Sequence, residues 1–318
     1  MRSWLDGDRA RIGAIDAGSN ALRLAIADVG PDGEVQVVAR RREPVRLGDR
    51  VFRDGQVGRK RREAAVHAFD RFSQLLDDYD VRWYRAVGTS ALRNADDRQF
   101  VLRAIRKRTG IEIDTIRGCD EASAVRAVVL NAFPDDEPPT VIADLGGGSL
   151  EITVMDRRGR RRSSAVLPVG TVRLMHDFEL SGQFSKRQAR RVGDYVRGLI
   201  DAKLGAPPSR VRGCAICGGN ARALARVAPG DDHGDMATVD LGYLAERFKR
   251  MRKRDLYSRM NAYGIRKDRA DVMPIAAIVF ACVGQWLGVD QLIAPAVGLV
   301  DGLLRDMGAA LAARRMIA

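Results

Sequence analysis

The sequence predicts an α/β protein built from two duplicated lobes with a cleft between them. Three observations lead to this prediction. A short apolar strand that ends near an acid and runs into a Gly/Ser turn occurs twice, and the two copies lie 128 residues apart. Asp16 and Asp144 occupy the same place in the two copies, as the last residue of the expected strand. The same succession of strands and helices then follows each turn, which indicates a repeated supersecondary unit. A length of 318 residues suits two domains of ordinary size.

The first lobe is expected over residues 1–124. Alternating apolar residues on both sides of the first turn predict strands. Apolar residues at helical spacing, such as Val66, Phe69 and Phe72, predict an amphipathic helix. We expect strands at residues 11–16, 21–28, 34–42, 83–87 and 112–117, and helices at 57–78, 96–108 and 121–133. The segment 134–139, which is rich in proline and acids, is interpreted as a surface connector.

The second lobe is expected over residues 125–304, and we expect the C-terminal helix, 305–318, to pack back on the first lobe. After about residue 240 the sequence indicates mostly helix. Apolar residues of the segment 270–287 are interpreted as core. We expect strands at residues 140–145, 150–156, 161–167, 211–216 and 291–294, and helices at 171–178, 185–204, 220–227, 270–287 and from 299 onward.

The charge balance indicates an anionic partner. The formal net charge is +13, and 47 of the 54 basic residues are arginines, which bind phosphate through paired hydrogen bonds. Aromatic residues make up only 6% of the chain and do not interleave with the basic runs, so no specific nucleic acid is expected. The run at residues 157–162 is interpreted as a solvated hairpin tip.

The composition also bounds the location of the protein. A hydrophobic content of 46% excludes a disordered chain. The first residues carry charge where a signal peptide needs an apolar run, and no segment is expected to span a membrane. Four cysteines are too few to cross-link a chain of this length, which favours the cytoplasm.

The two turns predict phosphate and metal binding. Glycines let the backbone approach an anion and direct amides at it, while a carboxylate at the strand end can hold a hydrated cation beside the same anion. No phosphate-binding loop of the GxxxxGK[ST] type is present. Cys214 and Cys217 have CxxC spacing, but no second cysteine pair accompanies them, so we interpret them as structural.

Eight segments, in this order, resemble the exopolyphosphatase/guanosine-pentaphosphate phosphatase family. The resemblance covers nearly the whole chain and implies two ribonuclease-H-like lobes of the actin–hexokinase–Hsp70 superfamily, in the short form without a C-terminal helical domain. The matching segments are Ile15–Asn20, Gly88–Arg93, Gly118–Ala122, Asp144–Ser149 with Glu151, Leu167–Arg173, Cys217–Arg222, Arg269–Val272 and Gly298–Gly302. Two positions depart from the family pattern: Ala21 replaces a hydroxyl residue and Val300 replaces an arginine.

The resemblance implies a role for each matched residue. Glu121 is implied as the general base that takes a proton from the attacking water. The implied metal-binding acids are Asp144, Glu151 and Asp16, and Mg²⁺ is the expected ion, with Mn²⁺ able to substitute. The implied phosphate-binding residues are Ser19, Asn20, Arg93, Gly146, Gly147, Gly148 and Ser149.

The expected function is metal-dependent hydrolysis of the terminal phosphoanhydride bond of inorganic polyphosphate. Two alternatives stay open: hydrolysis of pppGpp by the same residues, and a non-catalytic sensor of polyphosphate or nucleotide, which remains an alternative because of the Ala21 and Val300 departures. A sugar or acetate kinase of the same superfamily is disfavoured, because such kinases typically use an Asp base. We also expect a homodimer.

Overall fold

The computed structural model describes residues 10–180, 182–231 and 236–315, and its packing forms two compact units. The first comprises residues up to 128 together with those from 298 onward, and the second comprises residues 129–297. The divisions predicted from the sequence lie after residues 124 and 304. Within the described ranges, no helix has both the length and the apolar character needed to cross a membrane.

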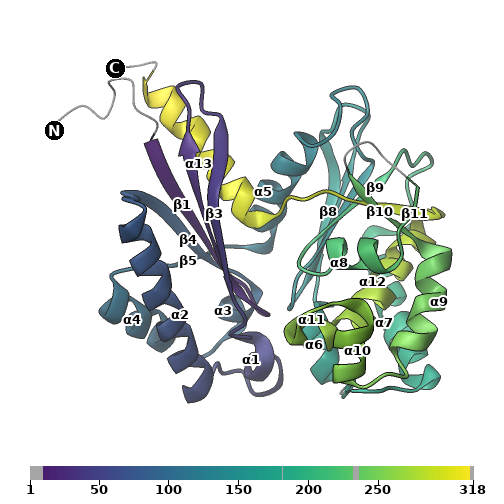
Figure 1. The fold of residues 1–318 in the computed structure, drawn as a ribbon. Coiled ribbons are helices and arrows are strands. Elements are labelled where there is room, and N and C mark those ends of the chain that lie inside the picture. Colours follow the sequence, from purple (N-terminus) through teal and green to yellow (C-terminus); the bar gives the residue numbers. More distant parts are fainter. Residues whose placement is uncertain (1–9, 181, 232–235, 316–318) are drawn as a thin grey trace. The chain divides into compact units, whose positions relative to one another are not determined.

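The first unit contains a five-stranded sheet in the order β3-β2-β1-β4-β5 (Figure 1). β1 pairs antiparallel with β2 and parallel with β4, and every position of β1 from Ile12 onward is buried. A central strand that is buried on both faces requires helices on both sides of the sheet. The strands are β1 (Ala10–Ala17), β2 (Leu22–Val29), β3 (Val35–Glu43), β4 (Trp83–Gly88) and β5 (Asp114–Thr115).

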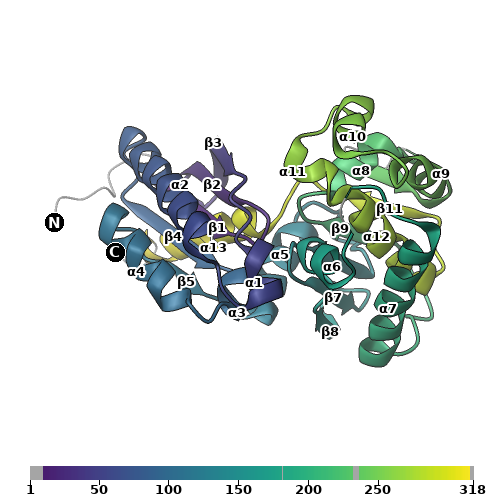
Figure 2. The ribbon, with the colours of Figure 1, turned by 90° about the horizontal axis from the view of Figure 1, so that it is seen from below.

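Helices α2 (Arg59–Asp78) and α4 (Arg98–Thr109) pack side by side on one face of this sheet, with Phe69 and Phe72 fully buried (Figure 1). Helix α13 (Leu299–Arg315) lies along β1 and β2 on the other face (Figures 1 and 2). Two glycines of α13 lie close to the backbone of other segments. A Cβ at Gly302 would lie 2.5 Å from the carbonyl oxygen of Ala124 in α5 (Gly118–Leu130), and a Cβ at Gly308 would lie 2.7 Å from that of Gly33.

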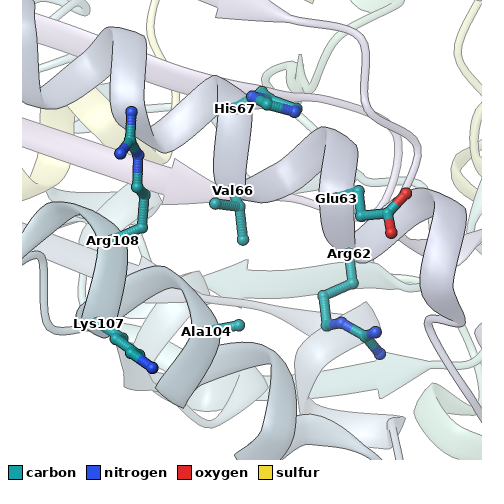
Figure 3. Close-up of a pocket in the computed structure, with 7 residues that line it drawn as sticks. All are labelled: Arg62, Glu63, Val66, His67, Ala104, Lys107 and Arg108. Carbon is teal, nitrogen blue, oxygen red and sulfur yellow. The ribbon is translucent and has the colours of Figure 1, made fainter.

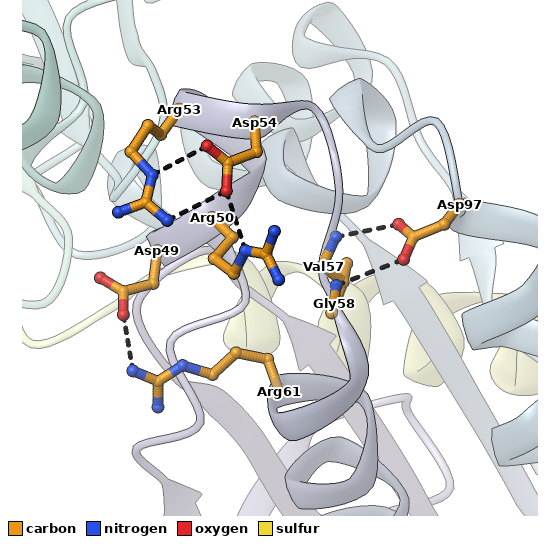
Figure 4. Close-up of polar contacts among 8 residues, drawn as sticks. All are labelled: Asp49, Arg50, Arg53, Asp54, Val57, Gly58, Arg61 and Asp97. Carbon is orange, nitrogen blue, oxygen red and sulfur yellow. Dashed lines mark hydrogen bonds and ion pairs between the residues drawn. The ribbon is translucent and has the colours of Figure 1, made fainter.

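Polar contacts fix the chain just before α2 (Figure 4). The carboxylate of Asp97, which precedes α4, accepts hydrogen bonds from the amides of Val57 at 2.9 Å and Gly58 at 3.3 Å. Gly58 has φ 75°, a conformation that suits glycine. Arg61 reaches back to Asp49 at 2.6 Å, so α2 is tied both to α4 and to the short helix α1 (Gly48–Asp54).

The second unit repeats the sheet of the first. Its strand order, read from the far edge, is β8-β7-β6-β9-β11, with β10 added antiparallel to β11. The strands are β6 (Val141–Leu145), β7 (Leu150–Met155), β8 (Arg161–Leu167), β9 (Cys214–Cys217), β10 (Ala237–Asp240) and β11 (Gln291–Ala294). The duplication expected from the sequence is therefore present in the order and direction of the strands.

Helix α12 (Met273–Leu287) forms the centre of the second core. Twelve of its fifteen residues are buried, as expected for a helix that is apolar on every side. It packs against α6 (Thr171–Asp177), α7 (Lys186–Leu204) and α9 (Leu241–Met251). The remaining helices of this unit are α8 (Ala221–Val227), α10 (Leu256–Tyr263) and α11 (Lys267–Ala270).

The structure corrects several local predictions. It contains α1, α3 (Ser90–Asn94) and β10, none of which was predicted, because segments of four to seven residues carry too little periodicity to be recognised. The strand expected over 112–117 is reduced to β5. Asp16 and Asp144 are each the penultimate residue of a strand and not the last, although they remain equivalent.

Candidate active site

The turn between β6 and β7, Gly146–Ser149, is held by the N-terminus of α6. The amide of Thr171 donates to the carbonyl oxygen of Gly146 at 3.0 Å, and the amide of Val172 donates to that of Gly147 at 2.8 Å. The side chain of Arg173 donates to the carbonyl oxygen of Gly148 at 3.0 Å. The turn carbonyls therefore point toward α6. Among the described residues, no hydrogen-bond acceptor is occupied by the amides of Gly147, Gly148 and Ser149. These three N–H groups can therefore donate to a bound anion.

Gly170, directly before α6, is required for this contact. A Cβ at this position would lie 2.2 Å from the amide nitrogen of Gly148 and 2.3 Å from that of Ser149. Its φ is −64°, so the requirement is one of space and not of backbone conformation. Gly170 lies in a segment that resembles the family, but its role depends on a contact between distant segments and was not predicted from the sequence.

The turn between β1 and β2 in the first unit is held in the same way. The amide of Gly48, at the start of α1, donates to the carbonyl oxygen of Ser19 at 2.9 Å. The buried hydroxyl of Ser19 accepts from the amide of Ala91 in α3 at 3.0 Å, which leaves its own proton available for donation. The side-chain oxygen of Asn20 accepts from Arg46 at 3.2 Å. Both turns are thus supported by a seven-residue helix that follows the third strand.

Asp144 and Glu151 form the acidic pair of the second unit. They are direct cross-strand partners in β6 and β7, and their exposed fractions are 9% and 2%. Gly218 lies beside them with φ 99°, and a Cβ there would be 3.1 Å from Oδ1 of Asp144. Mg²⁺ commonly binds one or two carboxylates and completes its shell with water and phosphate oxygens. The carboxylate oxygens of Asp144 and Glu151 are ligands of the kind that Mg²⁺ prefers.

Asp16 differs from its equivalent, Asp144, because its cross-strand partner is Arg23. Arg23 Nη1 donates to Asp16 Oδ2 at 2.6 Å, while Oδ1 is buried without a hydrogen-bond partner. Burial raises the pKa of Asp16 above its usual value, against the opposing effect of Arg23. Among the described residues of each unit, no three His, Cys, Asp or Glu side chains gather as a metal site.

Glu121 and Arg93 lie close together in the first unit. Glu121 stands in the first turn of α5 and is 9% exposed. Arg93 Nη1 lies 3.5 Å from Glu121 Oε2 and donates to the carbonyl oxygen of Ile116 at 2.7 Å. A buried carboxylate beside a guanidinium group is a suitable pair for accepting a proton next to a phosphate.

The basic run Arg59–Arg62 is engaged in local contacts. Arg59 pairs with Glu63 at 2.7 Å, and the Arg62 guanidinium lies 4.3 Å from the centre of the Phe100 ring. A cavity of about 410 Å³ opens between α2 and α4 at this point (Figure 3). Its lining is Arg62, Glu63, Val66, His67, Ala104, Lys107 and Arg108, all from these two helices. This run therefore lies on the surface of the first unit and is not part of the turn between β1 and β2.

The structure agrees with a structural role for the CxxC pair. Cys214 and Cys217 are both buried in β9, and burial raises the pKa of Cys214 to about 12. A thiol that stays protonated is a poor nucleophile and a poor metal ligand.

The chain is similar to known exopolyphosphatases. Exopolyphosphatase 2 of Mycobacterium tuberculosis is 27% identical over 311 residues, which cover 92% of this chain and 97% of that protein. Exopolyphosphatase 1 of the same species is 26% identical over 198 residues, or 62% of this chain. The match covers 56% of the length of exopolyphosphatase 1, so this chain spans about half the length of the first curated relatives that it matches.

Solved structures show the same fold. The crystal structure of an exopolyphosphatase from Cytophaga hutchinsonii superposes with a TM-score of 0.84 at 22% identity, covering 94% of this chain and 98% of that one. The Aquifex aeolicus member of the Ppx/GppA family superposes with a TM-score of 0.75 at 23% identity, covering 94% and 98%. The model of the Ppx/GppA phosphatase family matches residues 25–310. The chain therefore belongs to the Ppx/GppA phosphatase family.

Proposed function

We propose that this protein is a metal-dependent exopolyphosphatase that releases orthophosphate from the end of an inorganic polyphosphate chain. The observation that carries the proposal is the buried carboxylate of Glu121 beside Arg93, on a chain that matches nearly the full length of an exopolyphosphatase. The net charge of +13 favours a long polyanion as substrate.

Glu121 acts as the general base in this proposal. Its carboxylate accepts the proton of a water molecule as that water attacks the terminal phosphorus and the bond to the bridging oxygen breaks. The Arg93 guanidinium lies 3.5 Å from this carboxylate, where it can hold a phosphate oxygen next to the base. Arg93 uses Nη1 for Ile116 and Glu121, so its other N–H groups can bind a phosphate oxygen.

The second unit binds phosphate and metal in this proposal. The amides of the Gly146–Ser149 turn donate to phosphate oxygens, as backbone amides do in other anion sites. Asp144 and Glu151 would hold Mg²⁺, and the ion, when bound, neutralises the charge of the phosphate groups. Most of the catalytic effect then comes from positioning and charge neutralisation.

The experiment is to incubate purified protein with long-chain polyphosphate and Mg²⁺ and to follow orthophosphate and chain length together. Release from chain ends predicts that orthophosphate accumulates while the remaining chains shorten gradually. The control is Glu137→Gln, which makes the same change at an exposed residue of the 134–139 connector and should retain activity. A lack of orthophosphate release refutes the proposal. Release from pppGpp and not from polyphosphate would replace the substrate.

A further inference from the structure

A cavity of about 760 Å³ lies in the second unit, beside the hairpin of β7 and β8. Thr140, directly before β6, is part of its wall. Asp144 stands four residues further along, or about 13 Å at ~3.3 Å per strand residue. The cavity is therefore separate from the Gly146–Ser149 turn. Its lining is Thr140, Val154, Met155, Asp156, Arg157, Arg162, Ser163, Leu204, Ala206, Pro208, Ser209, Arg210, Val211, Arg212 and Trp286.

Four arginines line this cavity, and they come from two separate parts of the chain. Arg157 and Arg162 belong to the hairpin, whereas Arg210 and Arg212 belong to the segment between α7 and β9. All four are exposed, and none forms an ion pair within the described ranges of the chain. Arg212 Nη2 makes only a long contact, 3.5 Å, to the carbonyl oxygen of Asp156. The cavity thus presents guanidinium groups that no carboxylate of the described residues neutralises.

Asp156 is the one acidic residue of the lining, and its oxygens are already occupied. Oδ1 accepts from the amides of Arg158 at 2.8 Å and Arg160 at 2.9 Å, and Oδ2 accepts from the Arg160 side chain at 3.0 Å. These hydrogen bonds lower the pKa of Asp156. Its charge is therefore compensated inside its own turn, and the cavity stays positive.

A β-bulge brings Arg162 to the cavity. Val154 pairs with Ser163 and Met155 pairs with Arg161, so Arg162 is the extra residue of β8. Neighbouring residues of a regular strand point to opposite faces, yet Arg162 and Ser163 both line this cavity. A bulge redirects a side chain in this way.

The opposite wall is fixed by hydrogen bonds. Trp286 of α12 donates from Nε1 to the carbonyl oxygen of Gly205 at 2.9 Å. The amide of Arg212 donates to the hydroxyl oxygen of Thr140 at 2.9 Å. These bonds hold both ends of the segment 205–212 before any ligand arrives, which lowers the entropy cost of binding.

We propose that this cavity is a second, non-catalytic site that binds a linear chain of phosphate groups. Guanidinium groups bind phosphate oxygens through paired hydrogen bonds, and four of them around 760 Å³ exceed what one orthophosphate can contact. Trp286 is the single aromatic residue of the lining, which disfavours a nucleic acid strand that needs successive stacking surfaces. The proposal does not depend on the hydrolytic activity proposed above.

The test uses the fluorescence of Trp286. The chain contains three tryptophans, so a Trp4→Phe/Trp83→Phe variant leaves Trp286 as the reporter. Titration with inorganic tripolyphosphate should change its emission and reach saturation. Arg162→Gln/Arg210→Gln in this background should weaken binding roughly tenfold for each arginine removed. The matched control, Arg187→Gln/Arg190→Gln, makes the same charge change on the exposed side of α7 and should leave binding unaltered.

Further arms identify the source of the phosphate chain. Equal affinity for tripolyphosphate and a nucleoside triphosphate supports a site that recognises phosphate groups alone. Tighter binding of the nucleoside triphosphate supports the same site with an added contact to the nucleobase. The signal should persist in Glu151→Gln, which separates this site from the turn. Three results overturn the proposal: no emission change at low salt, equal weakening by the control variant, or binding of single-stranded RNA without binding of tripolyphosphate.

Discussion

Asp144 and Glu151 face each other across β6 and β7, although both are acids and both are almost completely buried. The equivalent pair of the first unit is Asp16 and Arg23, which form an ion pair at 2.6 Å. Like charges opposite each other in a sheet are destabilising. The duplicated fold therefore has an acid and an arginine at this position in the first unit and two acids, which suit a cation, in the second.

Magnesium should stabilise the second unit through this pair. We expect Mg²⁺ to raise the Tm of the wild-type protein, because a cation bound to the folded state alone shifts unfolding by mass action. Glu151→Gln should remove most of this rise without lowering the Tm in EDTA, since it relieves the repulsion between two acids. Differential scanning fluorimetry measures both. An equal Mg²⁺ response in the variant would exclude the pair as the metal site.

Asp16 should make stability depend on pH. Burial raises its folded-state pKa, so the stability it contributes is full at low pH and is lost as the pH rises through that pKa. Asp16→Asn does not titrate, and its stability relative to the wild type should therefore increase between about pH 4 and about pH 7. Urea denaturation at the two pH values gives this difference. A difference that stays constant with pH contradicts the prediction.

Two glycine substitutions should have opposite effects. Gly170→Ala places a Cβ 2.2 Å from the Gly148 amide and should destabilise by about 1–3 kcal/mol while distorting the turn. Gly198→Ala, inside α7 where nothing beyond the two chain neighbours and the local helix backbone lies within 4 Å of the new Cβ, should stabilise by up to about 1 kcal/mol. Chemical denaturation measures both. Comparable destabilisation by the two alanines would show that space at Gly170 is not the constraint.

The duplicated fold was predictable because it rests on long apolar patterns. The strands flanking both turns and the fully apolar α12 appear where their periodicity indicates. Alignment of the two halves at Asp16 and Asp144 predicted equivalent strands, and the shared strand order confirms that equivalence.

Other features depended on contacts that a sequence does not display. The support of each turn by α1 or α6 arises from backbone amides at helix starts, and the sequence gives no sign of α1. The run at 157–162 forms the exposed hairpin tip that was expected, but its Arg157 and Arg162 also line a cavity, because of the bulge at Arg162 and the distant segment 205–212. Both features depend on contacts between segments that lie far apart in the sequence.

Glu121→Gln tests the general base. The substitution keeps the size of the side chain and removes its ability to accept a proton. We expect kcat to fall about 10²–10⁴-fold with little change in KM, because the interaction lost is made mainly in the transition state. Steady-state kinetics beside the Glu137→Gln control provide the comparison. Turnover equal to that of the control would exclude Glu121 as the base.

The central claim is that the substrate is inorganic polyphosphate, attacked at its terminal phosphate. The most direct measurement is orthophosphate release by one protein preparation from long-chain polyphosphate, tripolyphosphate and pppGpp, in Mg²⁺ at the same ionic strength. We expect kcat/KM to be highest for polyphosphate, and Glu121→Gln to slow release about 10²–10⁴-fold from every substrate that the wild type hydrolyses. A higher kcat/KM for pppGpp, or release from polyphosphate by Glu121→Gln at the wild-type rate, would contradict this account.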